Sequence, residues 1–281
     1  MGSTRCGFIA FDLETTGLIE EGLPLPEVLC AATMIMRRVD DGHGRFLTEP
    51  TRTWPSRELE PAARPPRPMD TAELLQLVDY LWEYCGRCDM SQGPADLRVL
   101  AWNGIGYDFK LLHMHFEASP HPRAAYGASV VKQLALASCD PMLAFVFGRG
   151  FPVGLQATAS VLPSGPMYKN GSGADCQQQW LEGTDEDRLA VLHYCANDVE
   201  MTAGVFASLE ATGSIRWCAK SGKLNEWRPA GGRTELCAPV DEIMARKFAD
   251  NSFMRRDRVT GKLDPSKAVP TKAQFVGWLS L

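Results

Sequence analysis

Residues 7–18 read GFIAFDLETTGL. The apolar run, followed by Thr-Thr-Gly, predicts a buried central β-strand and then a tight turn. Side chains alternate between the two faces of a strand, so Asp12 and Glu14 leave the same face. Neighbouring carboxylates repel each other, and a hard cation such as Mg²⁺ or Mn²⁺ relieves that repulsion. The alternative is an ordinary pair of solvated acids at a strand end.

The sequence around this strand predicts a mixed α/β sheet with helices packed on it. Further strands are expected at residues 28–37, 45–47 and 98–102, and a hairpin at 215–218 and 224–227. Helices are expected at residues 70–84, 107–116, 140–148, 154–162, 185–209 and 270–278. Residues 50–68, with six prolines, and the Gly- and Ser-rich residues 163–175 are predicted to be loops without regular structure.

Composition narrows the class of protein. The chain has 281 residues, of which 45% are hydrophobic and 22% charged, which excludes a disordered, collagen-like or coiled-coil protein. It has no apolar run long enough for a membrane span and no signal-peptide pattern, so a cytoplasmic protein with no membrane partner is expected. Nine cysteines, an odd number, argue against a disulfide framework. Cys85 and Cys88 are the one close pair, and a zinc site would need two more ligands.

The distribution of charge bears on nucleic-acid binding. The net charge of −5 argues against a protein held to nucleic acid by its overall charge. Residues 250–281 nevertheless carry six basic and three acidic side chains, so the rest of the chain is the more acidic part. An acidic body with a basic end fits an enzyme whose site holds carboxylates and divalent cations, and a solvated tail is the alternative.

Three segments together resemble the DEDD superfamily of 3′-to-5′ exonucleases. The first motif is matched by FDLETTGL at residues 11–18, the second by WNGIGYD at 102–108, and the third by HYCAND at 193–198. They occur in the expected order, and the resemblance spans residues 7–209. It implies a ribonuclease H-like fold, with a mixed central sheet flanked by helices, over residues 1–212. Residues 213–281 would then be a C-terminal extension of a hairpin and helices packed on the same domain.

The resemblance implies an enzyme that hydrolyses phosphodiester bonds from the 3′ end of single-stranded DNA or RNA. Two divalent cations, Mg²⁺ or Mn²⁺, would be held by the four acids of the motifs, Asp12, Glu14, Asp108 and Asp198. The implied substrate contacts are Thr15, Thr16, Leu18, Asn103, Lys169 and His193. Lys169 is equally well explained as a solvated loop lysine. Phe8, Phe11, Trp102 and Phe109 are expected in the core rather than as stacking platforms.

The third motif leaves two candidates for the residue that positions the attacking water. The superfamily uses a Tyr four residues before the last Asp or a His five residues before it, and Tyr194 and His193 satisfy both spacings. On a continuous helix, Tyr194 shares a face with Asp198, and His193 points away from it. We therefore expect Tyr194 to be the catalytic residue, as in family B polymerase exonuclease domains and their stand-alone relatives. A His-type enzyme using His193 is the alternative.

Other functions remain open from the sequence alone. A nucleic-acid-binding module could keep the fold without activity, but it would have no physical reason to retain four acids and a tyrosine. An endonuclease with a related fold is expected to carry a different third motif. The C-terminal residues are too few for a polymerase domain, so no polymerase domain is expected in the same chain.

Overall fold

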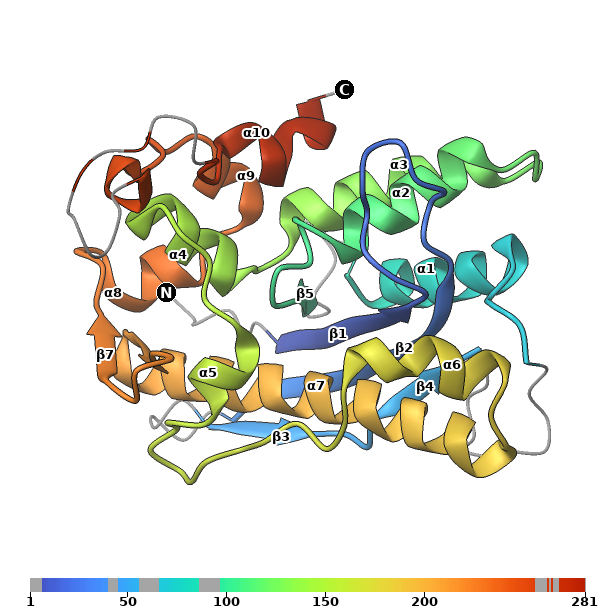
Figure 1. The fold of residues 1–281 in the computed structure, drawn as a ribbon, viewed down its shortest axis with the longest axis horizontal. Helices are drawn as coiled ribbons and strands as arrows, with labels where there is room; N and C mark the ends of the chain where they lie inside the picture. The colour runs from blue at the N-terminus through green and yellow to red at the C-terminus, as the bar shows by residue number, and fades with distance from the viewer. Residues whose placement is uncertain are drawn as a thin grey trace.

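The computed structural model describes residues 7–39, 45–55, 66–85, 97–255, 262, 264 and 268–280. A mixed sheet lies between helices (Figure 1). Its strands are β1 (Gly7–Thr15), β2 (Val28–Arg38), β3 (Phe46–Thr48), β4 (Arg52–Trp54) and β5 (Leu97–Leu100). The order is β3-β2-β1-β5, and β4 pairs with β2 as well. Because β1 is antiparallel to β2 and parallel to β5, the sheet is mixed, as predicted.

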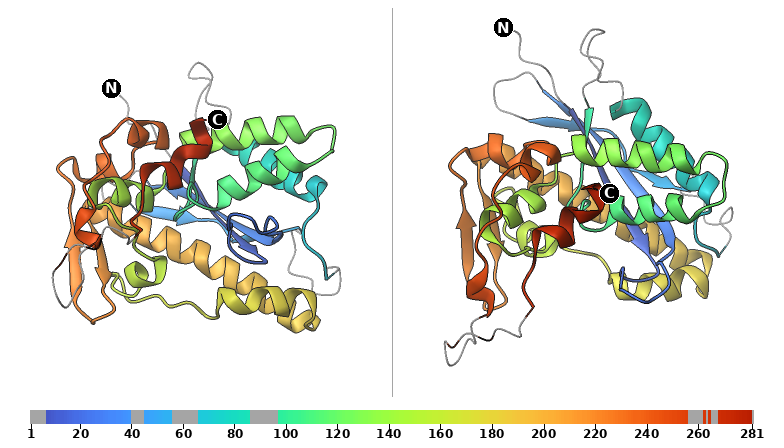
Figure 2. Two further views of the ribbon diagram at one scale, coloured as in Figure 1. Left: turned by 45° about the horizontal axis from the view of Figure 1, so that its top comes forward. Right: turned by 90° about the horizontal axis from the view of Figure 1, so that it is seen from above.

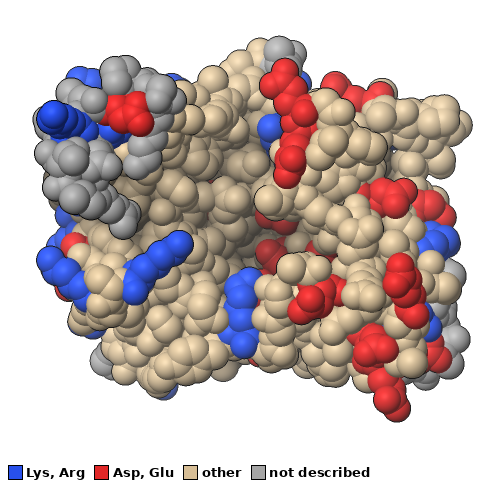
Figure 3. All heavy atoms as spheres, in the orientation of Figure 1, with Lys and Arg blue, Asp and Glu red and all other residues tan. Residues whose placement is uncertain are grey.

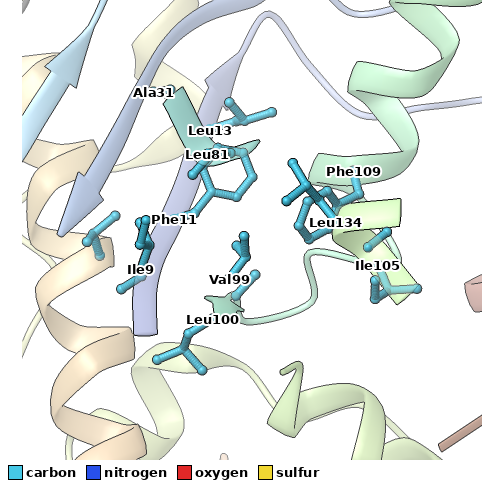
Figure 4. Packing of buried hydrophobic residues seen from close by; sticks show 14 of the residues in the cluster. Ile9, Phe11, Leu13, Ala31, Leu81, Val99, Leu100, Ile105, Phe109 and Leu134 are labelled. Carbon is cyan, nitrogen blue, oxygen red and sulfur yellow. The ribbon is translucent and has the colours of Figure 1, made fainter. Parts of the chain in front are cut away.

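β1 is the central strand, and the side chains on its two faces have different surroundings. Ile9, Phe11 and Leu13 share one face and belong to the main apolar core, in the layer shown in Figure 4. The Phe11 ring lies 5.7 Å from that of Phe109. On the other face, Phe8 packs against Phe206 with ring centroids 4.4 Å apart. Asp12 and Glu14 lie on this second face, as the alternation predicts.

Helices cover both faces of the sheet and gather at one end of it. They are α1 (Thr71–Cys85), α2 (Asp108–Ala118), α3 (Ala124–Ala137), α4 (Pro141–Arg149), α5 (Leu155–Ala159), α6 (Gly173–Leu181), α7 (Asp185–Thr212), α8 (Gly232–Leu236), α9 (Val240–Met244) and α10 (Lys272–Val276). α7 packs along β1 and β2, whereas α1 and α3 contact β5. Figures 1 and 2 show α1, α2 and α3 grouped on the side of the sheet away from α7.

α7 is continuous over 28 residues, which confirms the long helix predicted at 185–209. It begins at a capping box in which Thr184 and Asp187 exchange side-chain and backbone hydrogen bonds. It ends at Gly213, whose φ of 67° is the left-handed conformation that glycine adopts without strain. The third motif therefore lies well inside one regular helix.

Several predicted loops contain regular structure. The segment 50–68 was expected to be an ordered surface loop with no helix or central strand, and it holds the short strand β4, which pairs with residues 31–33 of β2. Three residues suffice because the edge of β2 supplies the partner groups. α6 begins at Gly173, inside the loop expected at 163–175, with Ser172 as its N-cap. α3, α8 and α9 were not predicted. Cys85 is buried at the end of α1, and Cys88 lies outside the described residues.

The C-terminal elements join the main core. The predicted hairpin is confirmed as β6 (Ile215–Cys218) and β7 (Leu224–Trp227). A 3-10 turn (Gly277–Ser280) follows α10 and carries Trp278, whose indole Nε1 donates to the Ile105 carbonyl at 2.9 Å. Val276 and Trp278 belong to the same apolar cluster as β1. Every helix in the described part of the chain is too short or too polar to span a bilayer.

Candidate active site

Four carboxylates from three distant segments come together beside the end of β1. Asp12 and Glu14 project from β1 toward α7, Asp108 is the first residue of α2, and Asp198 lies in α7. Three of them are nearly inaccessible, with exposed fractions of 8% for Glu14, 4% for Asp108 and 5% for Asp198. The Asp108 carboxylate accepts a hydrogen bond from the Leu13 backbone amide, which ties α2 to β1. We call these four acids the acidic cluster.

The acidic cluster lies on a concave face. Figure 3 shows the molecule hollowed near the centre of this face, with Asp and Glu side chains at the bottom of the hollow. In the same orientation, the ribbon shows α10 above this region and α7 below it (Figure 1).

Burial and mutual repulsion disfavour the charged form of these acids. Burial raises the pKa of Asp12 well above its usual range, and the charges of Asp108, Glu14 and Asp198 raise it further. Burial, with the Asp198 charge, raises the pKa of Glu14 to about 7. Burial also raises the pKa of Asp108. Burial and repulsion therefore oppose the ionised form of these acids, and a positive charge placed among them favours it.

Lys169 is the cation that the chain itself supplies. Its Nζ donates to the Tyr194 hydroxyl at 2.8 Å and forms an ion pair with Asp198. Burial opposes its charge, but these two hydrogen bonds raise the pKa of Lys169 above its usual value. The alternative of a solvated loop lysine is therefore wrong. Lys169 belongs to the site.

Tyr194 lies next to the acidic cluster and His193 does not. Tyr194 is buried, and burial raises the pKa of its phenol to about 12 although Lys169 opposes the rise. His193 is exposed on the outer side of α7. The structure thus separates the two candidates of the third motif, and it does not bring His193, an expected substrate contact, to the acidic cluster.

The turn after β1 is organised by threonine hydroxyls. The Thr15 Oγ1 lies 2.9 Å from the Gly17 carbonyl and 2.7 Å from the Tyr107 hydroxyl. The Thr16 hydroxyl accepts from the Glu27 amide at 2.9 Å. Both side chains that were expected to contact substrate are thus engaged within the protein. Leu18 projects from the same turn with 70% of its surface exposed, and it stays available as a contact.

Asn103 marks the loop of the second motif, and sequence reasoning missed the residue that holds this loop. Asn103 has a φ of 68°, a left-handed conformation that Asn tolerates better than most residues. The buried Asp140 carboxylate accepts from the backbone amides of Asn103 at 3.2 Å and Ile105 at 3.1 Å. It also caps α4 by accepting from Leu143 at 3.0 Å. Asp140 followed by Pro141 is a local signal for the capping role, and the second role has no local signal.

Two buried thiols adjoin the acidic cluster and were also missed. Cys195 donates weakly to the Asp12 carbonyl, with sulfur and oxygen 3.6 Å apart. Cys176 of α6 is hydrogen-bonded to Glu14. Burial raises the pKa of both thiols, so they remain protonated donors. Cys195 directly follows Tyr194, which was the available sequence signal.

The donor set fits hard divalent cations. One ligand atom each of Asp12, Glu14 and Cys195 lies within 4.8 Å of the others. Asp198 Oδ1 is buried and has no hydrogen-bond partner among the described residues, although Oδ2 is held by Lys169. Among the described residues, Asp108 and Asp198 do not belong to this compact group. The carboxylates of Asp12 and Glu14 and the unpartnered Asp198 Oδ1 are nevertheless oxygen donors of the kind that Mg²⁺ and Mn²⁺ prefer.

Comparisons with models of known protein families and with curated proteins find no match for this chain. The geometry of the acidic cluster is therefore the basis for a functional proposal.

Proposed function

We propose that this chain is a metal-dependent 3′-to-5′ exonuclease of the DEDD superfamily, with a ribonuclease H-like fold. The observation that carries the proposal is the convergence of four carboxylates from all three motifs on one buried cluster beside Tyr194. A structural protein gains nothing from such a cluster, because the buried charges oppose folding. Bound cations would neutralise these charges, and a metal-dependent reaction would explain why the four acids lie together.

The acids Asp12, Glu14, Asp108 and Asp198 would hold two Mg²⁺ or Mn²⁺ ions. Such ions, when bound, would acidify an attacking water and stabilise the 3′-oxygen, which leaves the phosphorus and stays on the sugar of the penultimate nucleotide. Tyr194 keeps its proton at neutral pH, because its pKa is about 12. Its hydroxyl would orient the water as a hydrogen-bonding group rather than remove a proton.

The residues around the acidic cluster suggest how a strand is bound. Leu18 would contact the terminal nucleotide from the turn after β1. Lys169 would contact the scissile phosphate, because a cation already held among carboxylates is available to a phosphate once these are neutralised. The proposed partner is the 3′ end of single-stranded DNA or RNA, as the resemblance to the DEDD superfamily implies.

The Tyr-type reading is favoured over the His-type alternative by one observation. The imidazole of His193 is exposed on the far side of a continuous α7, so it would have to cross the helix to reach the acidic cluster.

The test uses single-stranded DNA and RNA labelled at either end, incubated with Mg²⁺, Mn²⁺ or EDTA. The proposal predicts release of mononucleotides from the 3′ end with either metal and none in EDTA. A blocked 3′ terminus should stop the reaction. Cleavage of circular single strands would contradict the proposal and indicate an endonuclease.

A further inference from the structure

The segment before α6 presents three consecutive side chains in three different environments. Met167 packs with Leu162 and Val205 in a small apolar cluster of its own. Lys169 extends to Asp198 and Tyr194. Tyr168, between them, has 63% of its surface exposed. The neighbours are thus both anchored, and the tyrosine is directed into solvent.

The backbone on both sides of Tyr168 is fixed by one side chain. Gln156 Nε2 donates to the Met167 carbonyl at 3.2 Å, and Gln156 Oε1 accepts from the Lys169 amide at 2.6 Å. The Met167 amide also donates to the Ala159 carbonyl at 3.0 Å. An exposed side chain on such a framework keeps its position, unlike one on an unrestrained loop.

The Tyr168 ring has no intramolecular task in the part of the chain that the structure describes. It forms no aromatic contact there, and its hydroxyl has no hydrogen-bond partner there. By contrast Tyr126, another exposed tyrosine, donates to Asp79 at 3.0 Å and lies under Arg123. A large apolar ring held in water, one residue before the lysine that contacts Asp198, is a surface for a flat, apolar partner.

We propose that Tyr168 is a base-stacking residue, and this inference rests on the proposed function. Leu18 and Lys169 lie on different segments near the acidic cluster. Leu18 lies in the turn after β1, and Lys169 lies in the segment before α6. If the terminal nucleotide lies with Leu18, the scissile phosphate lies at the acids beside Lys169. The base that meets Tyr168 is then the penultimate one, on the 5′ side of that phosphate. Stacking accepts every base, so it favours single strands without sequence preference.

The experiment compares the wild type with Tyr168→Ala, Tyr168→Phe and the control Tyr126→Ala under single-turnover conditions with saturating Mn²⁺. Each protein degrades a single strand with a normal penultimate base, one with an abasic penultimate position, and one with an abasic position further from the 3′ end. A nitrophenyl ester of one nucleotide serves as a substrate that has no penultimate base.

On the normal strand, Tyr168→Ala should raise the half-saturating substrate concentration by roughly 5- to 150-fold, the range for losing one base stack. Tyr168→Phe and Tyr126→Ala should resemble the wild type. The penultimate abasic position should raise the half-saturating concentration of the wild type by a similar factor. It should cause no further rise for Tyr168→Ala. With the nitrophenyl ester, the variants should have the same half-saturating concentration as the wild type.

Two outcomes would overturn the stacking role while leaving the proposed function intact. One is an active Tyr168→Ala enzyme with wild-type half-saturation on the normal strand. The other is that the effects of Tyr168→Ala and of the penultimate abasic position multiply when the two changes are combined. A wild type inert on every substrate would instead refute the proposed function, and the stacking role with it.

Discussion

Tyr194 and Asp198 lie one turn apart on the buried face of α7, and Lys169 contacts both side chains. Residues four apart on a helix share a face, whereas His193 is displaced to the outside. The tyrosine hydroxyl is therefore held at the edge of the acidic cluster before any substrate arrives.

This relationship predicts unequal effects of two substitutions in the third motif. Tyr194→Phe should lower the single-turnover rate at saturating metal by about 10²-fold, because it removes the hydroxyl that orients the attacking water. His193→Ala should change that rate little. Single-turnover kinetics separate the chemical step from weak binding. A severe His193→Ala and a mild Tyr194→Phe would indicate a His-type enzyme.

The second prediction concerns metal-linked stability. Asp12→Asn should raise the free energy of unfolding in EDTA by at least ~1 kcal/mol, because it removes one buried charge from the repelling cluster. The wild type should gain about 3 kcal/mol from Mn²⁺ at a hundredfold excess over Kd, and Asp12→Asn much less. Denaturant titrations with and without Mn²⁺ measure both. Glu242→Gln, on an exposed acid, is the control and should show neither effect.

The sequence predicts some elements of the fold better than others. β1, β2 and α7 were expected from long apolar patterns and clear end signals. β4 was not, because a three-residue strand forms only where β2 offers its edge. α3, rich in alanine, has a weak polar-apolar contrast, although it packs on α1 and α2.

The candidate site shows the same division. The three motifs place the acids in order along the chain, and the alternation of β1 puts Asp12 and Glu14 on one face. The second role of Asp140 depends on α4 lying beside the loop of the second motif, which no local pattern encodes. The role of Lys169 was left open for the same reason, because the side chains that it contacts, Tyr194 and Asp198, lie in α7.

The third prediction is a pH dependence of stability without metal. The pKa of Glu14 is raised from 4.5 to about 7, and burial raises that of Asp140 from 3.8 to about 6. A raised carboxyl pKa favours the folded state at low pH, so stability should fall as the pH rises through these values. Denaturant titrations in EDTA from about pH 4.5 to about pH 8 measure the fall. Glu14→Gln should make it shallower, and a stability that rises over this range would contradict the assignment.

The fourth prediction tests Asp140 as the residue that holds the second motif. Asp140→Ala leaves two buried amides and one partly buried amide without an acceptor, at about 1–3 kcal/mol for each buried one, so it should destabilise the fold by roughly 2–6 kcal/mol. Asp140→Asn keeps one acceptor oxygen and should be milder. Thermal unfolding measures both variants. Equal stability of Asp140→Ala and the wild type would show that the loop is held by other contacts.

The fifth prediction concerns the C-terminal extension. Trp278→Ala should destabilise the protein by about 3–5 kcal/mol, the usual loss for a buried aromatic side chain. Trp278→Phe keeps most of the packing but loses the bond to the Ile105 carbonyl, worth about 1 kcal/mol. If the extension supports the second motif, Trp278→Phe should also reduce nuclease activity at temperatures where it is folded. Full activity would confine Trp278 to a role in stability.

The most direct test of the catalytic assignment is the single-turnover release of 3′-terminal mononucleotides by the wild type and by Asp198→Asn, purified in parallel. The substitution keeps the shape of the side chain and removes its charge, so circular dichroism should show an intact fold. The account predicts Mg²⁺- or Mn²⁺-dependent release by the wild type, and a rate at least ~10³-fold lower for Asp198→Asn. Equal rates for the two proteins, or release that persists in EDTA, would contradict it.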